Sequence, residues 1–190
     1  MLRPIAILLA AALSTAAAQV GQSFPYTNKY GRATIEYRHE GLGVVANYDY
    51  SQRNHSGPWL LIDVALGSAD RFVLHRTNFR LVRPDGQTIP LASQQQGQAD
   101  MENINLLIQN ARIHRHNLDS YFPQRDRHEA FNFFSLPFVR SISDEAIVDN
   151  DRVAQGPLLF RSPDGSWKEG THRLVLTNEK AKAELPITLQ

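Results

Sequence analysis

The segment that decides the fold is Pro58-Trp59-Leu60-Leu61-Ile62-Asp63-Val64-Ala65-Leu66. In an extended chain, successive side chains point to opposite faces of the strand. The apolar side chains at every second position therefore face one way, namely Leu60, Ile62, Val64 and Leu66, while Asp63 faces the other way. This alternation predicts a β-strand over 58–66 with its apolar face in a core.

The same period of two continues outward from this segment in both directions. Ala33, Ile35 and Tyr37 alternate with polar residues, which predicts a strand over 33–37. An aromatic strand, broken by Pro137, is expected over 128–139. Further strands are expected over 44–50, 71–75, 78–83, 87–91, 146–148, 158–161, 171–177, 181–185 and 187–189.

Two turns carry the same three residues, Pro84-Asp85-Gly86 and Pro163-Asp164-Gly165. Proline presets φ for a turn, aspartate accepts hydrogen bonds from the turn backbone, and glycine takes the left-handed position. Each triplet lies between two expected strands, so each predicts a tight reversal of the chain.

One stretch departs from the strand pattern. Asp100 precedes an apolar stripe at helical spacing, made of Met101, Ile104, Leu107, Ile108 and Ala111. This predicts an α-helix over about 100–112 with Asp100 as its N-terminal cap. The glutamine-rich segment 94–98 is expected to be a flexible connection, and 113–118 to be extended. Together with the loop that follows, the helix forms an expected insertion at about 94–127.

Many short strands separated by Pro/Gly turns indicate an all-β fold, an antiparallel β-sandwich, which needs roughly seven to nine of them. Three stretches resemble the immunoglobulin-like, telokin-like domains of small exported bacterial proteins: Trp59 to Leu66, Phe79 to Gly86, and Gly170 to Leu176. The resemblance implies a scaffold or binding domain without catalytic residues. We therefore expect an immunoglobulin-like antiparallel β-sandwich with one inserted α-helix, built as a single domain over 19–190.

Residues 1–18 have the three parts of a secretory signal. Arg3 precedes the apolar run 5–13, and small residues end the segment at Ala18. The apolar run is shorter than the roughly 20 residues that a membrane-spanning helix needs. We therefore predict a removable signal peptide over 1–18, a periplasmic or secreted protein, and no membrane span. The chain has no cysteine, so burial rather than disulfides must stabilise it.

The charge balance argues against a nucleic-acid partner. The chain has 20 basic and 19 acidic residues, and removal of 1–18 takes away only Arg3 among them. Phosphate contacts need an excess of lysine and arginine, which a nearly neutral chain lacks. The same balance argues against a polybasic membrane-surface protein.

Histidine gives the sequence its candidate metal ligands. His114 and His116 would share one face of an extended segment, and His128 follows nearby. Two imidazoles at this spacing can share a metal ion, with Asp119 or Asp126 as a further ligand. The arginines around them would repel a cation, so a solvated basic face is the competing interpretation.

Those arginines are themselves candidate partner-binding residues: Arg112, Arg115, Arg125 and Arg127. They make 112–128 a locally basic segment in a neutral chain, suited to an acidic partner or an anionic component of the cell envelope. The competing interpretation is compositional, because the chain contains sixteen arginines and only four lysines.

Five of the six tyrosines lie between Tyr26 and Tyr50. Exposed aromatic rings stack on sugars and anchor protein interfaces, which makes this region a candidate for sugar or peptide binding. Tyr37 is in phase with Ile35, so part of the set is expected in the core.

The sequence therefore favours a non-catalytic, exported binding or assembly domain that recognises a protein or an envelope partner. It contains no Gly-x-Ser-x-Gly elbow, phosphate-binding glycine loop or dinucleotide fingerprint, and no cofactor is expected. One alternative is a histidine-based metal or small-ligand carrier in the periplasm. A second alternative is an enzyme that acts on envelope polysaccharide.

Overall fold

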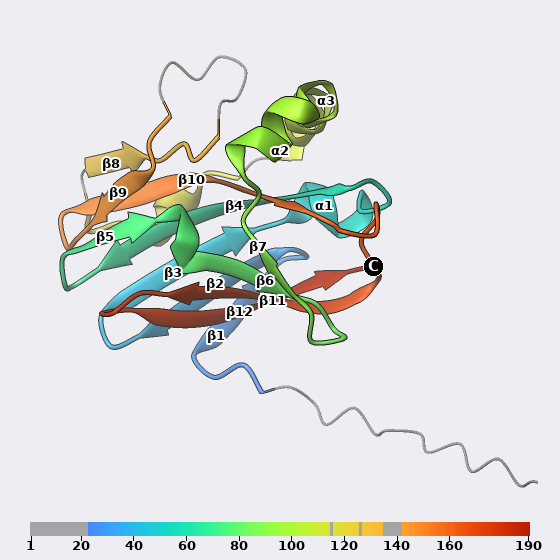
Figure 1. The fold of residues 1–190 in the computed structure, drawn as a ribbon. Helices are drawn as coiled ribbons and strands as arrows, with labels where there is room; N and C mark the ends of the chain where they lie inside the picture. Colours follow the sequence, from blue (N-terminus) through green and yellow to red (C-terminus); the bar gives the residue numbers. More distant parts are fainter. Residues whose placement is uncertain (1–22, 115, 126, 135–141) are drawn as a thin grey trace, which may run out of the picture.

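The computed structural model describes residues 23–114, 116–125, 127–134 and 142–190. The fold is mostly β, with three sheets and a few short helices (Figure 1). The predicted signal peptide, Arg115 and Asp126 lie outside the described residues. Within the part that is described, no helix has the length and apolar character needed to cross a bilayer.

The largest sheet has six strands, and its order brings the two halves of the chain together. The strands are, in spatial order, β1 (Thr27–Tyr30), β2 (Thr34–His39), β3 (Leu42–Asn47), β4 (Trp59–Ser68), β10 (Arg152–Arg161) and β8 (Arg127–Ala130). The tight connection between β2 and β3 explains their register. Glu40 and Gly41 both have positive φ, 47° and 78°, which closes a two-residue hairpin of the kind that suits the strand twist.

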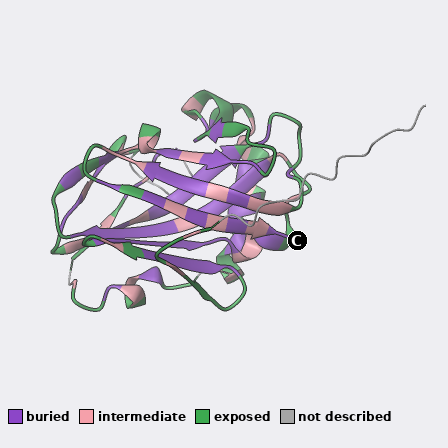
Figure 2. Cartoon of the chain, turned by 90° about the horizontal axis from the view of Figure 1, so that it is seen from below, coloured by how far each residue is buried: buried purple, intermediate pink, exposed green. Residues whose placement is uncertain are grey.

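The other two sheets are smaller. One contains β12 (Lys182–Leu189), β11 (Gly170–Thr177), β6 (Phe79–Val82) and β7 (Thr88–Pro90). The other pairs β5 (Phe72–His75) with β9 (Glu145–Val148). Side chains of the six-stranded and four-stranded sheets meet in one core, among them Ile35 and Ile62 from the first and Leu174 and Leu185 from the second. The central strands are buried along most of their length, whereas the edge strands β1 and β8 are mostly exposed, as are the connections (Figure 2).

Strand β4 is buried on both faces, so the outward face that carries Asp63 is not left to solvent. Leu60 and Ile62 lie in the core between the sheets, as expected. On the opposite face Ala65 is also fully buried, in a second cluster that contains Val45, Leu118, Phe122 and Val153. Only Asp63 is partly exposed along the strand. The inserted stretch 94–127 therefore covers the face of the six-stranded sheet that is turned away from the four-stranded sheet; we call this the outer face.

The predicted helix is confirmed as α3 (Met101–Ala111), with Ile104, Leu107, Ile108 and Ala111 buried. Asp100 precedes it, but its carboxylate does not cap a helix N–H. Instead it accepts hydrogen bonds from Trp59 Nε1 on β4 and from Asn103 Nδ2, both at 2.6 Å. Asp100 thus ties the helix to the sheet, and α3 belongs to the core rather than projecting from it.

Two expectations for the same stretch are wrong. The glutamine-rich segment is a helix, α2 (Gln94–Ala99), so the insertion has two helices and not one. The segment expected to be extended over 113–118 begins and ends in 3-10 turns, η2 (Arg112–His114) and η3 (Leu118–Tyr121). A short helix, α1 (Asp49–Arg53), also replaces the end of the strand expected over 44–50, and the 3-10 turn η1 (Arg76–Asn78) links β5 to β6.

The expectation of a purely antiparallel sheet fails at one edge. Strand β8 pairs with β10 in parallel, with Arg127 opposite Arg152 and Ala130 opposite Gln155. The aromatic strand expected over 128–139 ends at Ala130, after which Phe131 and Phe133 are fully buried. Part of that expected strand, 135–139, lies outside the described residues.

Candidate functional site

A row of three residues crosses the outer face of the six-stranded sheet. Arg38 on β2 lies opposite Gly43 on β3, and Gly43 lies opposite Gly67 on β4. Two adjacent glycines leave the sheet without side chains at this place. They form a bare shelf of backbone beside Arg38, which we call the glycine shelf (Gly43 and Gly67).

The insertion places an aromatic ring and a second guanidinium on the glycine shelf. A Cβ at Gly43 would lie 2.9 Å from Phe122 Cε1, and a Cβ at Gly67 would lie 2.7 Å from Arg125 Cζ. Both glycines are therefore required for this close approach. The ring of Phe122 is itself flanked by two cations, with Arg38 Cζ 5.3 Å and Arg125 Cζ 5.6 Å from its centroid.

Arg38 is held in place by the residues around it. Its Nε donates to Glu36 Oε1 at 2.5 Å, and its Nη2 donates to the backbone carbonyl of Tyr121. The other carboxylate oxygen of Glu36 accepts a hydrogen bond from the Tyr30 hydroxyl at 2.8 Å. This bond to Glu36 raises the pKa of Tyr30, since ionised phenolate would lose it and meet the carboxylate charge.

The charge of Arg125 is balanced by nearby carboxylates less closely than the charge of Arg38. Its Nε donates to the backbone carbonyl of Asp149 at 3.4 Å, and across the described ranges no carboxylate lies within 4.0 Å of its guanidinium. Burial lowers the pKa of Arg125, and the neighbouring charge of Arg38 lowers it further, although Asp149 opposes these effects. The fold thus holds two like charges near each other, with one carboxylate, Glu36, in contact with Arg38.

Two hollows adjoin this pair, and Arg38 and Arg125 line both of them. The first has a volume of about 330 Å³ and extends along His39 and the β2–β3 turn. The second has a volume of about 250 Å³ and extends along Tyr121 and Phe122. A ligand in either hollow would therefore lie beside both arginines, and arginine pairs with carboxylate or phosphate in a bidentate geometry.

Of the predicted arginines, Arg125 is the one that lines these hollows. Arg112 lies at the end of α3, and Arg127 begins β8, where its backbone N–H donates to Asp151 O at 3.3 Å. Arg115 lies outside the described residues. The second guanidinium comes from Arg38, far away in sequence, which no local pattern singled out.

The structure separates the predicted metal ligands. His114 Nδ1 lies 3.1 Å from Asp49 Oδ2, and its ring lies against Tyr50. His116 and His128 line a different hollow of about 270 Å³, which is also lined by Asp63 and Glu129. The described portion of the chain contains no group of three or more His, Asp or Glu side chains placed to hold a metal ion.

Within that hollow, neighbouring groups already engage two of the polar side chains. His128 Nδ1 lies 3.3 Å from Asp119 Oδ1, one of the two aspartates expected as a further ligand. Glu129 accepts hydrogen bonds from the Ile147 N–H at 3.2 Å and from Arg152 Nη1 at 2.7 Å. Glu129 therefore joins β8 to β9 and β10, a role in the fold.

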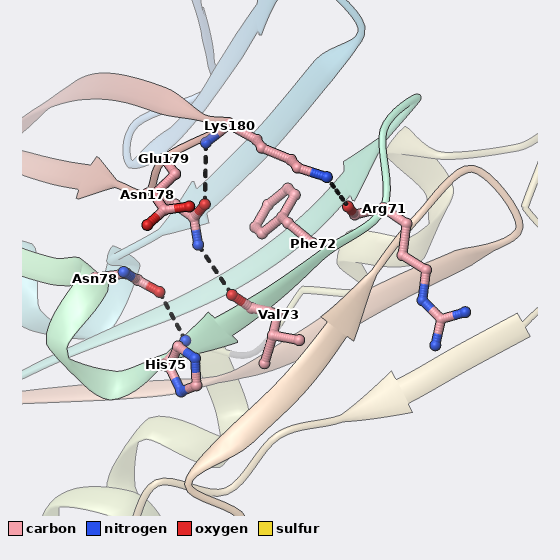
Figure 3. A pocket seen from close by; sticks show the side chains of 8 residues that line it. All are labelled: Arg71, Phe72, Val73, His75, Asn78, Asn178, Glu179 and Lys180. Carbon is pink, nitrogen blue, oxygen red and sulfur yellow. Dashed lines mark hydrogen bonds between the residues drawn. The ribbon is translucent and has the colours of Figure 1, made fainter.

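A further hollow, of about 660 Å³, lies beside β5 (Figure 3). The loop between β11 and β12 crosses it with two side chains that donate to the edge of β5. Asn178 Nδ2 donates to Val73 O at 2.9 Å, and Lys180 Nζ donates to Arg71 O at 3.2 Å. These donors satisfy backbone carbonyls of the protein itself, so this hollow ranks below the arginine pair as a candidate site.

The chain matches no protein-family model and no curated protein. Among solved structures it is similar to the yjhA protein from Bacillus subtilis, with 12% identity and a TM-score of 0.41. That similarity covers 82% of this chain and 96% of the other. A likeness at this level assigns neither a fold family nor a function.

Proposed function

We propose that this chain is a non-catalytic, exported binding domain of the immunoglobulin-like sandwich type, which recognises an anionic partner through Arg38 and Arg125. The observation that carries the proposal is the pair of guanidinium groups, those of Arg38 and Arg125, that both lie close to the Phe122 ring above the glycine shelf. Packing between strands does not require such an arrangement, since two like charges in proximity disfavour each other.

A bound anionic group would supply negative charge beside the two guanidinium groups. A carboxylate or phosphate bound beside the two arginines would reduce the repulsion between their charges and accept hydrogen bonds from a guanidinium group. Charge-assisted hydrogen bonds contribute roughly 1.5–3 kcal/mol each, more where water is partly excluded. Arg125 is partly buried on the glycine shelf, so its charge is less well hydrated than that of an exposed arginine.

Binding of poly-L-glutamate by isothermal titration calorimetry at low and moderate salt tests this proposal. Arg125→Gln should weaken binding about tenfold, because one of the two guanidinium groups is lost. Arg53→Gln is the matched control, since Arg53 is exposed at the end of α1 and lies away from both hollows. Absence of binding, or an equal loss in both variants, contradicts the proposal.

The two imidazoles that line one hollow, those of His116 and His128, support a second candidate function, a metal or small-ligand carrier in which water or the carried molecule completes the coordination. Imidazole and carboxylate are ligands that Zn²⁺ and Cu²⁺ accept. Titration of the purified protein with each ion, compared with a His116→Gln/His128→Gln double variant, tests it. A carrier binds one equivalent that the double variant loses, whereas His114→Gln leaves binding unchanged. No observation favours the third possibility, an enzyme acting on polysaccharide, because Glu129 in this hollow is engaged by Arg152.

A further inference from the structure

Glu36 is a buried carboxylate on the outer face of the six-stranded sheet, beside the arginine pair. Its side chain is only 6% exposed, although it carries a charge. It lies two residues before Arg38 on β2, so both side chains point to the same face of the strand. Its Oε1 accepts a hydrogen bond from Arg38 Nε at 2.5 Å, and its Oε2 accepts one from the Tyr30 hydroxyl at 2.8 Å. Glu36 is therefore fixed against the guanidinium of Arg38.

Tyr30 holds Glu36 from the neighbouring strand β1. It is 43% exposed and packs edge-on against Tyr121, with 5.4 Å between the ring centroids. Of the other tyrosines between 26 and 50, Tyr37 and Tyr48 are buried, as expected for part of the set. The hydrogen bond to Glu36 gives the exposed Tyr30 a role in positioning that carboxylate.

Glu36 limits what Arg38 can offer to a ligand. Two nitrogens of the Arg38 guanidinium are engaged, because Nε donates to Glu36 and Nη2 donates to the carbonyl of Tyr121. The edge formed by Nε and Nη2, which could bind a carboxylate in a bidentate geometry, is thus occupied by the protein itself. The third nitrogen, Nη1, lies on the glycine shelf, 3.2 Å from the position that a Cβ of Gly43 would take.

The same carboxylate lowers the positive charge that a ligand meets. Arg38 and Arg125 carry two positive charges, and Glu36 offsets one of them at contact distance. Asp149 also acts on Arg125, but its carboxylate is paired with Arg152 Nε at 3.0 Å. An incoming anion is therefore attracted by the two arginines and repelled by Glu36. Charges a few ångströms apart near a protein surface interact strongly enough to change an affinity severalfold.

These contacts give Glu36 a role at the proposed binding surface. We infer that Glu36 holds Arg38 in place and, through its charge, competes with the anionic partner for the arginine pair. The inference rests on the proposed function and concerns the regulation of that same surface. A salt bridge that only positions Arg38 predicts weaker binding when its carboxylate is neutralised. A competing carboxylate predicts the opposite, tighter binding.

Glu36→Gln is the informative variant, because glutamine keeps the size of the side chain and an oxygen that accepts from Arg38 Nε, but removes the charge. Its affinity for poly-L-glutamate, measured by isothermal titration calorimetry, should rise about fivefold over the parent chain at low salt. The gain should shrink as salt is added, because ions screen the charges of a surface in contact with solvent. If Glu36→Gln fails to fold, Glu36→Thr replaces it in the same comparison, since its β-branched side chain suits a strand.

Two further variants separate the charge of Glu36 from other effects. Tyr30→Phe removes the hydroxyl that binds Glu36 and keeps the ring that packs on Tyr121, so the carboxylate keeps its charge. Its affinity should stay within about twofold of the parent chain. Glu102→Gln is the matched control for net charge, since Glu102 is exposed in the first turn of α3 and lines neither hollow. Its affinity should also stay near that of the parent.

The outcomes separate the inference from the proposed function. Tighter binding by the Glu36 variant, with both other variants near the parent, supports the inference. Equal or weaker binding by the Glu36 variant overturns the inference and leaves the anionic partner in place. An equal gain in Glu102→Gln or in Tyr30→Phe also overturns it, because net charge or a loosened hydrogen bond then explains the effect. Failure of the parent chain and of the Glu36 variant to bind poly-L-glutamate overturns the proposed function together with the inference.

Discussion

Arg83 Nη1 donates a hydrogen bond to Asp164 Oδ2 at 2.6 Å, and this bond joins the two Pro-Asp-Gly turns of the chain. The Arg83 side chain is almost entirely buried, at 2% exposure, although it is charged. The same Nη1 also donates to Gln87 Oε1 at 2.8 Å, within the first hairpin. A buried arginine is tolerated only where such partners replace its water.

Arg83 and Asp164 should therefore be coupled energetically. We expect Arg83→Leu to lower the free energy of unfolding by about 1–3 kcal/mol, because Asp164 and the Gln87 side chain lose a charged hydrogen-bond donor. A double-mutant cycle with Asp164→Ala should give a coupling energy of about 1–3 kcal/mol, measured by urea unfolding. Arg161→Ala, at an exposed arginine of β10, is the control with a change near zero. Additive effects of the two substitutions would show that the bond contributes nothing.

Gly67→Ala should displace Arg125 without unfolding the protein. The new Cβ would lie 2.7 Å from Arg125 Cζ, and the end of a flexible side chain can move aside. We expect the melting temperature to change by at most a few degrees, and the affinity for anionic probes to fall about as far as in Arg125→Gln.

Gly156→Ala provides the contrast on the next strand. There a Cβ would lie 2.2 Å from the backbone carbonyl of Phe131, which cannot move aside so cheaply. This variant should lose several kcal/mol of stability, consistent with overpacking against backbone. Similar melting temperatures for the two alanine variants would contradict this account of the glycine shelf.

Local features could be predicted from the sequence, since they depend on a few neighbouring residues. The hairpin at Pro84-Asp85-Gly86 is confirmed, with Gly86 at φ 89°, whereas the second Pro-Asp-Gly turn lies between β10 and β11, which belong to different sheets. Helix α3 is confirmed by its apolar stripe. Helix α2 could have been predicted too, because Ser93 and Gln96 form a capping box: the Gln96 N–H donates to Ser93 Oγ at 3.1 Å, and the Ser93 N–H donates to Gln96 Oε1 at 2.8 Å.

The candidate site could not be predicted in the same way. Arg38, Gly43 and Gly67 come together only through the register of three strands, and Arg125 arrives from the insertion. No local pattern encodes such pairing. The burial of β4 on both faces could have been predicted from the sequence. Asp63 suggested that its face of the strand is exposed to solvent, but Leu61 and Ala65 on the same face are apolar.

The stability of the protein should depend on pH through His172. This residue is fully buried, and burial lowers the pKa of its imidazole, with Arg83 as a further cause. At about pH 7.5 and above the imidazole is almost entirely neutral in both the folded and the unfolded chain, so it hardly makes stability depend on pH there. As pH falls below that value the unfolded chain gains a proton that the folded chain resists, so the free energy of unfolding decreases.

Urea unfolding at pH 7.5, 6.5 and 5.5 measures this effect. The decrease between pH 6.5 and 5.5 should reach at most about 1.4 kcal/mol from this one group. His172→Gln keeps a polar side chain of similar size without a titrating ring, so its stability should decrease less over the same interval. Parallel pH profiles for the two proteins would assign the pH dependence to other groups.

Asn178 and Lys180 should protect an edge of β5 from pairing with other chains. They donate to the carbonyls of Val73 and Arg71, groups that an added strand would otherwise use (Figure 3). We expect Asn178→Ala/Lys180→Ala to retain the fold, to lose about 1–2 kcal/mol of stability, and to self-associate at concentrations where the parent chain does not. Light scattering after size-exclusion chromatography measures the association, and Lys168→Ala, at an exposed lysine, is the control. If the double variant loses stability but keeps the oligomeric state of the parent, these hydrogen bonds only attach the loop between β11 and β12 and do not prevent self-association.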